Sequence, residues 1–167
     1  TLPHKVRVLS QASAEQWKHK LTVTGPKVDW KQEIALEFLE EILPSMDRPL
    51  RSYFECHYLP ATVFYRIDDP SEPPAGYCKM HLDSGPRHFL KFLCYLNDST
   101  ESGGGTLFQD IEESPLLAGE GVLFAPSCQL HSAKWPTKGK RCIVTVAFTP
   151  SPLPWKDACK AFGVPFH

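Results

Sequence analysis

The amino-acid sequence predicts one mainly β domain flanked by N-terminal helices. Helical periodicity is confined to the first third of the chain, and short apolar segments separated by turn residues follow from Tyr53 onward. The composition agrees, because 167 residues with 42% hydrophobic side chains suit a single hydrophobic core. We expect a helical buttress at residues 1–50, a β core at 51–150 and a C-terminal segment at 151–167.

Two helices are expected before the β core. A Ser or Asp followed three residues later by Gln is typical of a capping box, and this pattern begins at Ser13 and at Asp29. The first helix is expected to run to His19, and the second to end at Pro44, since proline removes a backbone hydrogen bond inside a helix. The apolar face of the second helix consists of Ala35, Phe38, Leu39 and Ile42. A short closing helix is expected over residues 154–162.

Strands are expected over about eight segments, which are 53–58, 61–66, 76–83, 88–97, 105–109, 121–125, 129–134 and 141–149. Short strands at such spacing favour a sandwich or a barrel, and the double-sheet jelly roll, or double-stranded β-helix, of cupin-like proteins is one such fold. The polar, proline-rich segment 66–76 cannot be a central strand. We expect it to form a loop that either contacts a substrate or is simply solvated.

A candidate metal site is formed by His81, Asp83 and the distant His131, which we call the His–Asp–His triad. Side chains two apart in a β-strand project to the same face, so His81 and Asp83 can reach one metal ion. His131 would then join them from another strand. Two imidazoles and one carboxylate form the facial triad that holds iron(II) in non-haem oxygenases and leaves positions open for chemistry.

Arg141 opens an apolar run over residues 142–148. If that run is a strand, Arg141 shares a face with Ile143, Thr145 and Ala147. A guanidinium beside an iron site can bind a carboxylate through two charge-assisted hydrogen bonds in one plane. An anionic co-substrate is therefore expected.

These residues resemble the core of the Fe(II)/2-oxoglutarate-dependent dioxygenases, and above all the prolyl 4-hydroxylase-like branch. The resemblance extends from about Ala61 to Thr149. It is carried by His81-x-Asp83, Tyr95-Leu96-Asn97, the run 103–108, His131 and Arg141. Phytanoyl-type dioxygenases share the later part of this pattern, and the Gly-Gly-Gly-Thr at 103–106 departs from the small-residue pair and acidic residue that are usual in the family.

The resemblance implies a jelly roll in which residues 1–167 form a single catalytic domain. The expected catalytic residues and Fe(II) ligands are His81, Asp83 and His131. The residues expected to bind the distal carboxylate of 2-oxoglutarate are Arg141, Thr145 and Tyr95, with Tyr65 lining the same cavity. With O2 as the second co-substrate and ascorbate as reductant, decarboxylation of 2-oxoglutarate to succinate and CO2 would accompany hydroxylation of an unactivated C–H bond.

A prolyl residue in a protein or peptide is the expected substrate. A free amino acid or another small metabolite, as used by phytanoyl-type relatives, is the alternative. A third interpretation is a cupin-like binding domain without turnover, and the intact triad and Arg141 argue against it. Arg87 and Trp135 lie near the expected mouth of the site and are candidate substrate contacts, with local packing as the alternative role.

The charge of the chain indicates neither a nucleic acid nor a membrane as partner. Its 18 basic and 19 acidic residues are well mixed, so no extended basic face is expected. No run approaches the roughly 18 consecutive apolar residues of a membrane-spanning helix. The oligomeric state has no signature in the sequence.

The six cysteines are spread over the chain without a C-x-x-C pair, which disfavours a zinc site built from them. Cys94 and Cys142 lie inside apolar runs, where a free cysteine packs as a small hydrophobic residue. Reduced thiols in the cytoplasm or nucleus are the simplest account. An even number of cysteines also permits disulfides, and the family includes hydroxylases of the secretory pathway, so that location stays open.

Overall fold

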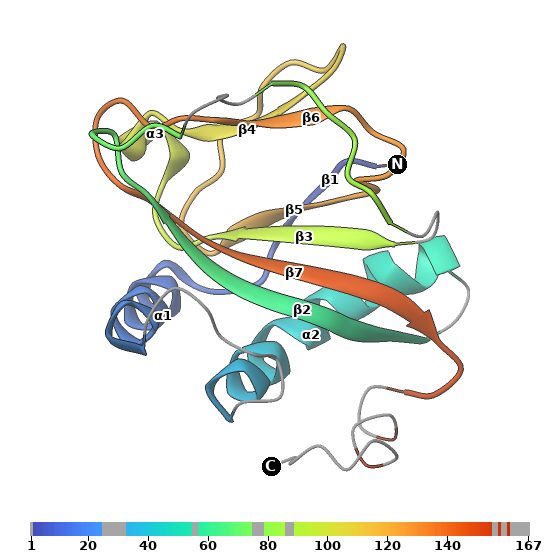
Figure 1. Ribbon diagram of the computed structural model, residues 1–167. Helices are drawn as coiled ribbons and strands as arrows, with labels where there is room; N and C mark the ends of the chain where they lie inside the picture. Colours follow the sequence, from blue (N-terminus) through green and yellow to red (C-terminus); the bar gives the residue numbers. More distant parts are fainter. Residues whose placement is uncertain are drawn as a thin grey trace.

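A five-stranded antiparallel sheet lies at the centre of the protein (Figure 1). The computed structural model describes residues 2–24, 33–54, 57–74, 79–85, 89–154, 157 and 160. The strands of the large sheet, in spatial order, are β1 (His4–Arg7), β5 (Glu120–Phe124), β3 (Leu90–Tyr95), β7 (Arg141–Ser151) and β2 (His57–Asp68). A small antiparallel sheet pairs β4 (Gly105–Phe108) with β6 (His131–Lys134).

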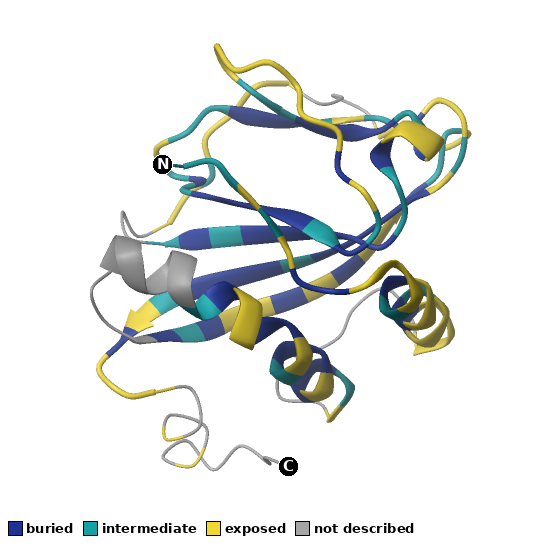
Figure 2. Cartoon of the chain, turned by 180° about the vertical axis from the view of Figure 1, so that it is seen from behind, coloured by how far each residue is buried: buried dark blue, intermediate teal, exposed yellow. Residues whose placement is uncertain are grey.

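Helices cover one face of the large sheet, and the small sheet lies over the other (Figure 1). The covering helices are α1 (Gln11–Thr24) and α2 (Glu33–Phe54), while the short α3 (Ser99–Ser102) precedes β4. Figure 2 shows exposed residues on the sides of α1 and α2 that point away from the sheet. Within the described ranges, no helix has both the length and the apolar character needed to cross a membrane.

The apolar side chains form two cores, one on each side of the large sheet. The larger core packs α1 and α2 onto the sheet through side chains such as Trp17 and Phe38. The smaller core lies between the two sheets and includes Leu93, Tyr95, Phe124 and Ile143. Strand β7 serves both cores, because its residues alternate between the faces of the sheet: residues 142, 144, 146 and 148 face the helices, while residue 143 faces the small sheet.

The predicted helices are present, but their limits differ. α1 begins at Gln11, and its first turn is capped by the hydroxyl of Ser10, which accepts a hydrogen bond from the backbone of Ser13 at 3.0 Å. α2 continues through Pro44, where the sequence predicted its end. Leu43 and Met46 beside this proline are buried, so packing on the sheet outweighs the missing hydrogen bond.

Three strand predictions also differ from the structure. Segments 53–58 and 61–66 were expected as separate strands, but α2 extends to residue 54 and a single strand, β2, then runs over 57–68 with an irregularity between residues 60 and 62. β1 was not predicted, because its sequence His-Lys-Val-Arg has little apolar content. In the described part of 76–83, only an isolated bridge at His81 is present. The cap expected at Asp29 and most of the expected helix 154–162 lie outside the described residues.

The thiols agree with the expectation for buried cysteines where they can be observed. Cys94 and Cys142 are free and buried, and Cys128 is free and exposed. Burial raises the pKa of the Cys94 thiol to about 12, so it is protonated at neutral pH and acts as a packing side chain.

Candidate active site

The His–Asp–His triad comes together beside the start of β6. His81 and His131 form an antiparallel bridge whose two N···O distances are 3.0 and 3.1 Å. The backbone N–H of Asp83 donates to the carbonyl oxygen of Pro126 at 2.9 Å. These bonds hold residues 79–85 against the small sheet, so residues far apart in the sequence become neighbours.

The three side chains of the triad converge on one point. Oδ1 of Asp83 lies 3.2 Å from Nε2 of His81 and 3.4 Å from Nε2 of His131. One ligand atom from each residue lies within 4.8 Å of the other two. A cluster of two imidazole nitrogens and one carboxylate oxygen at this spacing suits a single divalent transition metal such as Fe(II).

Backbone carbonyls fix the orientation of both imidazoles. Nδ1 of His81 lies 2.8 Å from the carbonyl oxygen of Lys79, and Nδ1 of His131 lies 2.8 Å from that of Gln129. Because a carbonyl only accepts, each Nδ1 carries the proton and each Nε2 presents a lone pair to the triad centre. Nε2 of His131 is buried and has no hydrogen-bond partner among the described residues, so a metal ion would satisfy it.

The surroundings favour the protonation states that metal ligands need. Burial lowers the pKa of His131 below its ordinary value, which keeps the imidazole neutral. Burial opposes ionisation of Asp83, but the hydrogen bond and positive charge of Lys91 outweigh it and hold the pKa of Asp83 below its usual value. The triad therefore offers two neutral imidazoles and one carboxylate at neutral pH.

Lys91 contacts the triad from β3. Its Nζ lies 3.0 Å from Oδ2 of Asp83, so Oδ1 is the oxygen that faces the two imidazoles. Lys91 therefore orients the carboxylate and leaves one of its oxygens for a metal. Sequence reasoning missed this residue; the available signal was its position in the predicted strand, on the same face as Leu93 and Tyr95.

Arg141 lies deeper in the fold and is 1% exposed. Its Nη1 lies 2.8 Å from Oδ2 of Asp68, and its Nη2 lies 2.7 Å from the hydroxyl of Tyr95 and 3.2 Å from Oγ1 of Thr106. The Tyr95 and Thr106 hydroxyls are themselves 2.6 Å apart. Arg141 thus joins β7 to β2, β3 and β4 in one buried polar network.

A second arginine shares the same carboxylate. Arg66 contacts Asp68 through Nε at 2.8 Å from Oδ1 and through Nη2 at 2.9 Å from Oδ2. We call Arg66, Asp68 and Arg141 the arginine group. Arg66 and Asp68 lie on one face of β2, and Asp68 is directly paired with Arg141 in the β2–β7 register. Sequence reasoning wrongly placed Arg66 and Asp68 in a loop, because this register joins strands that are distant in the sequence. It also missed Thr106 on β4.

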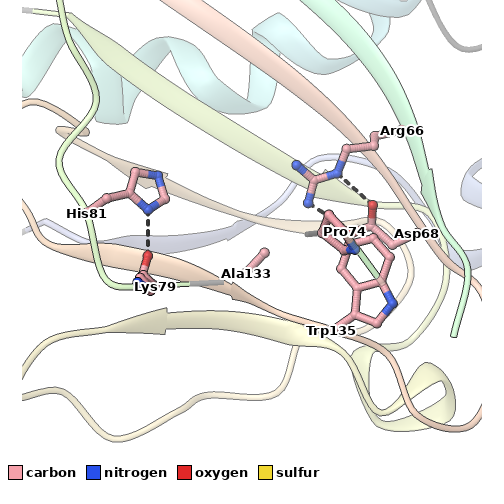
Figure 3. A pocket seen from close by; sticks show the side chains of 7 residues that line it. All are labelled: Arg66, Asp68, Pro74, Lys79, His81, Ala133 and Trp135. Atoms are coloured by element: carbon pink, nitrogen blue, oxygen red, sulfur yellow. Dashed lines mark hydrogen bonds and ion pairs between the residues drawn. The ribbon is translucent and has the colours of Figure 1, made fainter. Parts of the chain in front are cut away.

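A pocket of about 550 Å³ extends from His81 of the triad to Arg66 and Asp68 of the arginine group. Its lining residues are Arg66, Asp68, Pro74, Lys79, His81, Ala133 and Trp135. Figure 3 shows His81 at one end, the side chains of Arg66, Asp68, Pro74 and Trp135 at the other, and Ala133 between them. The volume lies within the range of small-molecule sites in proteins.

The structure places the other predicted site residues differently. Tyr65 lies on the helix-facing side of β2, where its hydroxyl is 2.9 Å from Oγ1 of Thr22, so it does not line the cavity. It alternates with Arg66, which takes the inner face instead. Thr145 shares the inner face of β7 with Arg141, but four residues of strand place it about 13 Å further along. The hydroxyls that contact the Arg141 guanidinium come from Thr106 and from Tyr95, which was predicted to bind the distal carboxylate of 2-oxoglutarate together with Arg141.

Of the two candidate substrate contacts, one can be located. Trp135 lines the pocket, and its indole N–H donates to the carbonyl oxygen of Asp69 at 2.9 Å. This bond ties the segment after β6 to the segment after β2. Arg87 lies outside the described residues.

No protein-family model matches the sequence, and no curated protein matches it either. Solved structures do match in fold. CytC3 with Fe(II) and α-ketoglutarate has a TM-score of 0.69 at 14% identity, covering 89% of this chain and 72% of CytC3. HygX from Streptomyces hygroscopicus with iron bound has a TM-score of 0.67 at 13% identity, covering 90% of this chain and 83% of HygX.

A third similar structure is the viral collagen prolyl hydroxylase of Paramecium bursaria Chlorella virus-1 in its 2-oxoglutarate complex. The TM-score is 0.67 at 18% identity, and the match covers 90% of this chain and 97% of the hydroxylase. All three identities are too low to transfer an activity, so the likeness concerns the fold. The predicted jelly roll is confirmed: the chain has the fold of non-haem oxygenases whose solved structures contain iron or 2-oxoglutarate.

Proposed function

We propose that the protein is an Fe(II)- and 2-oxoglutarate-dependent oxygenase that hydroxylates an unactivated C–H bond. The observation that carries the proposal is the pair of Nε2 lone pairs that face one oxygen of Asp83, at the end of a pocket whose other end holds a guanidinium. The triad supplies the donor set for iron(II), and the buried, unpartnered Nε2 of His131 fits that role. The similar folds support the same class of activity.

The residues of the chain have separate tasks in this proposal. His81, Asp83 and His131 hold the iron, which when bound supplies O2 activation coupled to decarboxylation of 2-oxoglutarate. The backbone carbonyls behind the two imidazoles and Lys91 behind the carboxylate keep the ligands in place. The arginine group provides positive charge for the distal carboxylate of the co-substrate. No general acid or base is required of the protein.

For the substrate, we propose a prolyl residue in a protein or peptide. The resemblance in sequence to the prolyl 4-hydroxylase-like branch supports it, as does the fold shared over 97% of the viral collagen prolyl hydroxylase. A free amino acid or small metabolite is the second candidate, favoured by the equally good match in fold to CytC3 and HygX. Proline-containing peptides and free amino acids, assayed for a mass gain of one oxygen atom, would distinguish the two.

The activity itself is tested by succinate production. Purified protein would be supplied with Fe(II), 2-oxoglutarate, ascorbate and O2, beside a His81→Ala control. We expect succinate from the wild-type protein and none from the variant. A wild-type protein that forms no succinate and does not bind 2-oxoglutarate in the presence of Mn(II) would overturn the proposal in favour of a binding domain without turnover.

A further inference from the structure

A second cavity, of about 130 Å³, is lined by residues of β1, β4 and β5 and by the segment between β4 and β5 (Figure 1). Its buried lining residues are Thr106, Leu116 and Val122, and the partly buried Phe108 lies beside them. Three of these four belong to the smaller core, so the cavity is a gap in the packing of that core. Among the described residues, it shares no lining side chain with the larger pocket. We call it the apolar cavity.

Polar groups around the apolar cavity already have partners. The buried Thr106 hydroxyl lies 2.6 Å from that of Tyr95 and 3.2 Å from Nη2 of Arg141. At the exposed rim, Nζ of Lys5 lies 3.4 Å from Oε1 of Glu120. A gap bounded by apolar side chains takes up small apolar guests and is a poor site for ions or polar ligands.

Aromatic side chains connect the apolar cavity to the triad. The ring of Phe108, which lines the cavity, meets Phe124 edge to face with 5.1 Å between the ring centroids. Phe124 in turn contacts the imidazole of His131, with 4.8 Å between the centroids. Phe124 is fully buried, so one buried ring lies between the wall of the cavity and a metal ligand.

The proposed reaction has three reactants, and two of them would share the larger pocket. 2-Oxoglutarate and the substrate would both lie beside the triad there, which leaves little room for O2 to enter from that side. O2 is small and apolar, so it favours an apolar environment over water. Rotamer changes of packed side chains are sufficient to let such a molecule pass.

We propose that the apolar cavity takes up O2 and delivers it to the triad past Phe108 and Phe124. This inference depends on the proposed function and adds the route of the second co-substrate. The larger pocket would then serve 2-oxoglutarate and the substrate, while O2 enters through the gap in the smaller core.

The first test locates O2 in the metal-free protein. Dissolved O2 is paramagnetic and speeds the nuclear relaxation of nearby methyl groups, so NMR under raised O2 pressure reports its local concentration. The methyl groups of Leu116 and Val122 should relax several-fold faster than those of Leu43 and Val63, which are equally buried but lie in the larger core. Equal enhancement in the two pairs would overturn the proposal.

The second test fills the cavity and measures the KM for O2 in succinate formation. Val122→Phe places a ring in the gap, and Ser114→Trp covers the exposed rim without a change in the core. Both should raise the KM for O2 several-fold and leave the KM for 2-oxoglutarate unchanged. Leu117→Phe is the matched control, because Leu117 is exposed and adjoins Leu116 but does not line the cavity.

The two tests fail in distinguishable ways. A wild-type KM for O2 in both Val122→Phe and Ser114→Trp would overturn the route, even with selective methyl relaxation. An equal rise in Leu117→Phe would overturn it as well. A wild-type protein that forms no succinate would overturn the proposed function, whereas the relaxation of the metal-free protein would still decide whether the cavity takes up O2.

Discussion

The two ends of the pocket are built in different ways. At the metal end, His81 and Asp83 come from one short motif, and a single backbone bridge adds His131. At the other end, the arginine group and the hydroxyls around it come from β2, β3, β4 and β7. The metal end is thus a local arrangement of ligands, whereas the arginine end is part of the packing of the fold. Mutations at the two ends should therefore fail in different ways.

The largest effect is expected at the metal end. Asp83→Ala or His131→Ala removes a ligand that no neighbouring described side chain replaces, so iron-dependent succinate formation should be abolished. The fold should persist, because neither side chain belongs to the two apolar cores. Circular dichroism and Mn(II) calorimetry would test both statements. His19→Ala, an exposed histidine on α1, is the control; retained turnover in either triad variant would contradict the assignment.

At the arginine end, the main expected consequence of a mutation is a loss of stability. Arg141→Ala leaves the buried Tyr95 and Thr106 hydroxyls and one side of Asp68 without their cation. Breaking a buried ion pair on one side typically costs about 3–5 kcal/mol, and we expect the free energy of unfolding to fall by about 3 kcal/mol. Weaker 2-oxoglutarate binding should accompany this loss, with a smaller effect on Mn(II) affinity. Urea unfolding and calorimetry measure the two consequences separately.

An exposed ion pair provides the control for that measurement. Lys18 and Glu15 on α1 lie 3.3 Å apart at the surface, and Lys18→Ala should change the free energy of unfolding by less than about 0.5 kcal/mol. If Arg141→Ala kept wild-type stability and lost 2-oxoglutarate binding alone, Arg141 would be a direct ligand contact.

The same contrast explains what the sequence could predict. The triad was predicted because its ligands carry a chemical signature, and Arg141 was predicted because it opens the apolar run that was expected to form a strand. Asp68 could not be assigned, since its partner depends on the β2–β7 register. Tyr65 was predicted to line the cavity, but its side chain points towards α1. The sequence of β2 alone does not show which of its two faces meets the helices.

The fold, too, could be predicted from the sequence only in part. The amphipathic pattern of Ala35, Phe38, Leu39 and Ile42 predicted α2 correctly, because it reports a buried face directly. Its extension beyond Pro44 depends on burial of Leu43 and Met46 against the sheet, which local propensity does not include. β1 depends on pairing with β5 in the same way, since its own residues are mostly polar.

An intermediate effect is expected from the residue that supports the metal end from β3. Lys91→Met should weaken Mn(II) binding by about tenfold to a hundredfold, the usual cost of removing a partner of a ligand. The reason is that Oδ2 of Asp83 would lose its hydrogen bond and the carboxylate could rotate. Lys91→Arg should restore part of the affinity. The preference for 2-oxoglutarate over 2-oxovalerate, which has a methyl group in place of the distal carboxylate, should not change. If Lys91→Met bound Mn(II) as tightly as the wild-type protein does, Lys91 would not orient the Asp83 carboxylate.

The smallest expected effect is a pH dependence that is present at the metal end of the pocket and absent at the arginine end. The pKa of His131 in the folded protein lies below its ordinary value of 6.5, so the unfolded chain takes up this proton more readily than the folded one. The stability of the metal-free protein should therefore fall as the pH drops below about 6.5, and His131→Asn should lack this part of the change. If the metal-free protein became more stable as the pH dropped below about 6.5, the folded protein would bind the proton more tightly than the unfolded chain, and the prediction would be wrong.

The affinity for a metal ion should also fall as the pH drops, because imidazoles must be neutral to act as ligands. Guanidinium groups stay charged over this range, and although burial lowers the pKa of Arg141, its contacts with Tyr95 and Asp68 outweigh that and raise it above its usual value. Between about pH 7.5 and about pH 6, Mn(II) affinity should decrease while the preference of the loaded protein for 2-oxoglutarate over 2-oxovalerate stays constant. A preference that falls in parallel with metal affinity would mean that the two ends do not act independently, because distal-carboxylate recognition would then depend on a histidine.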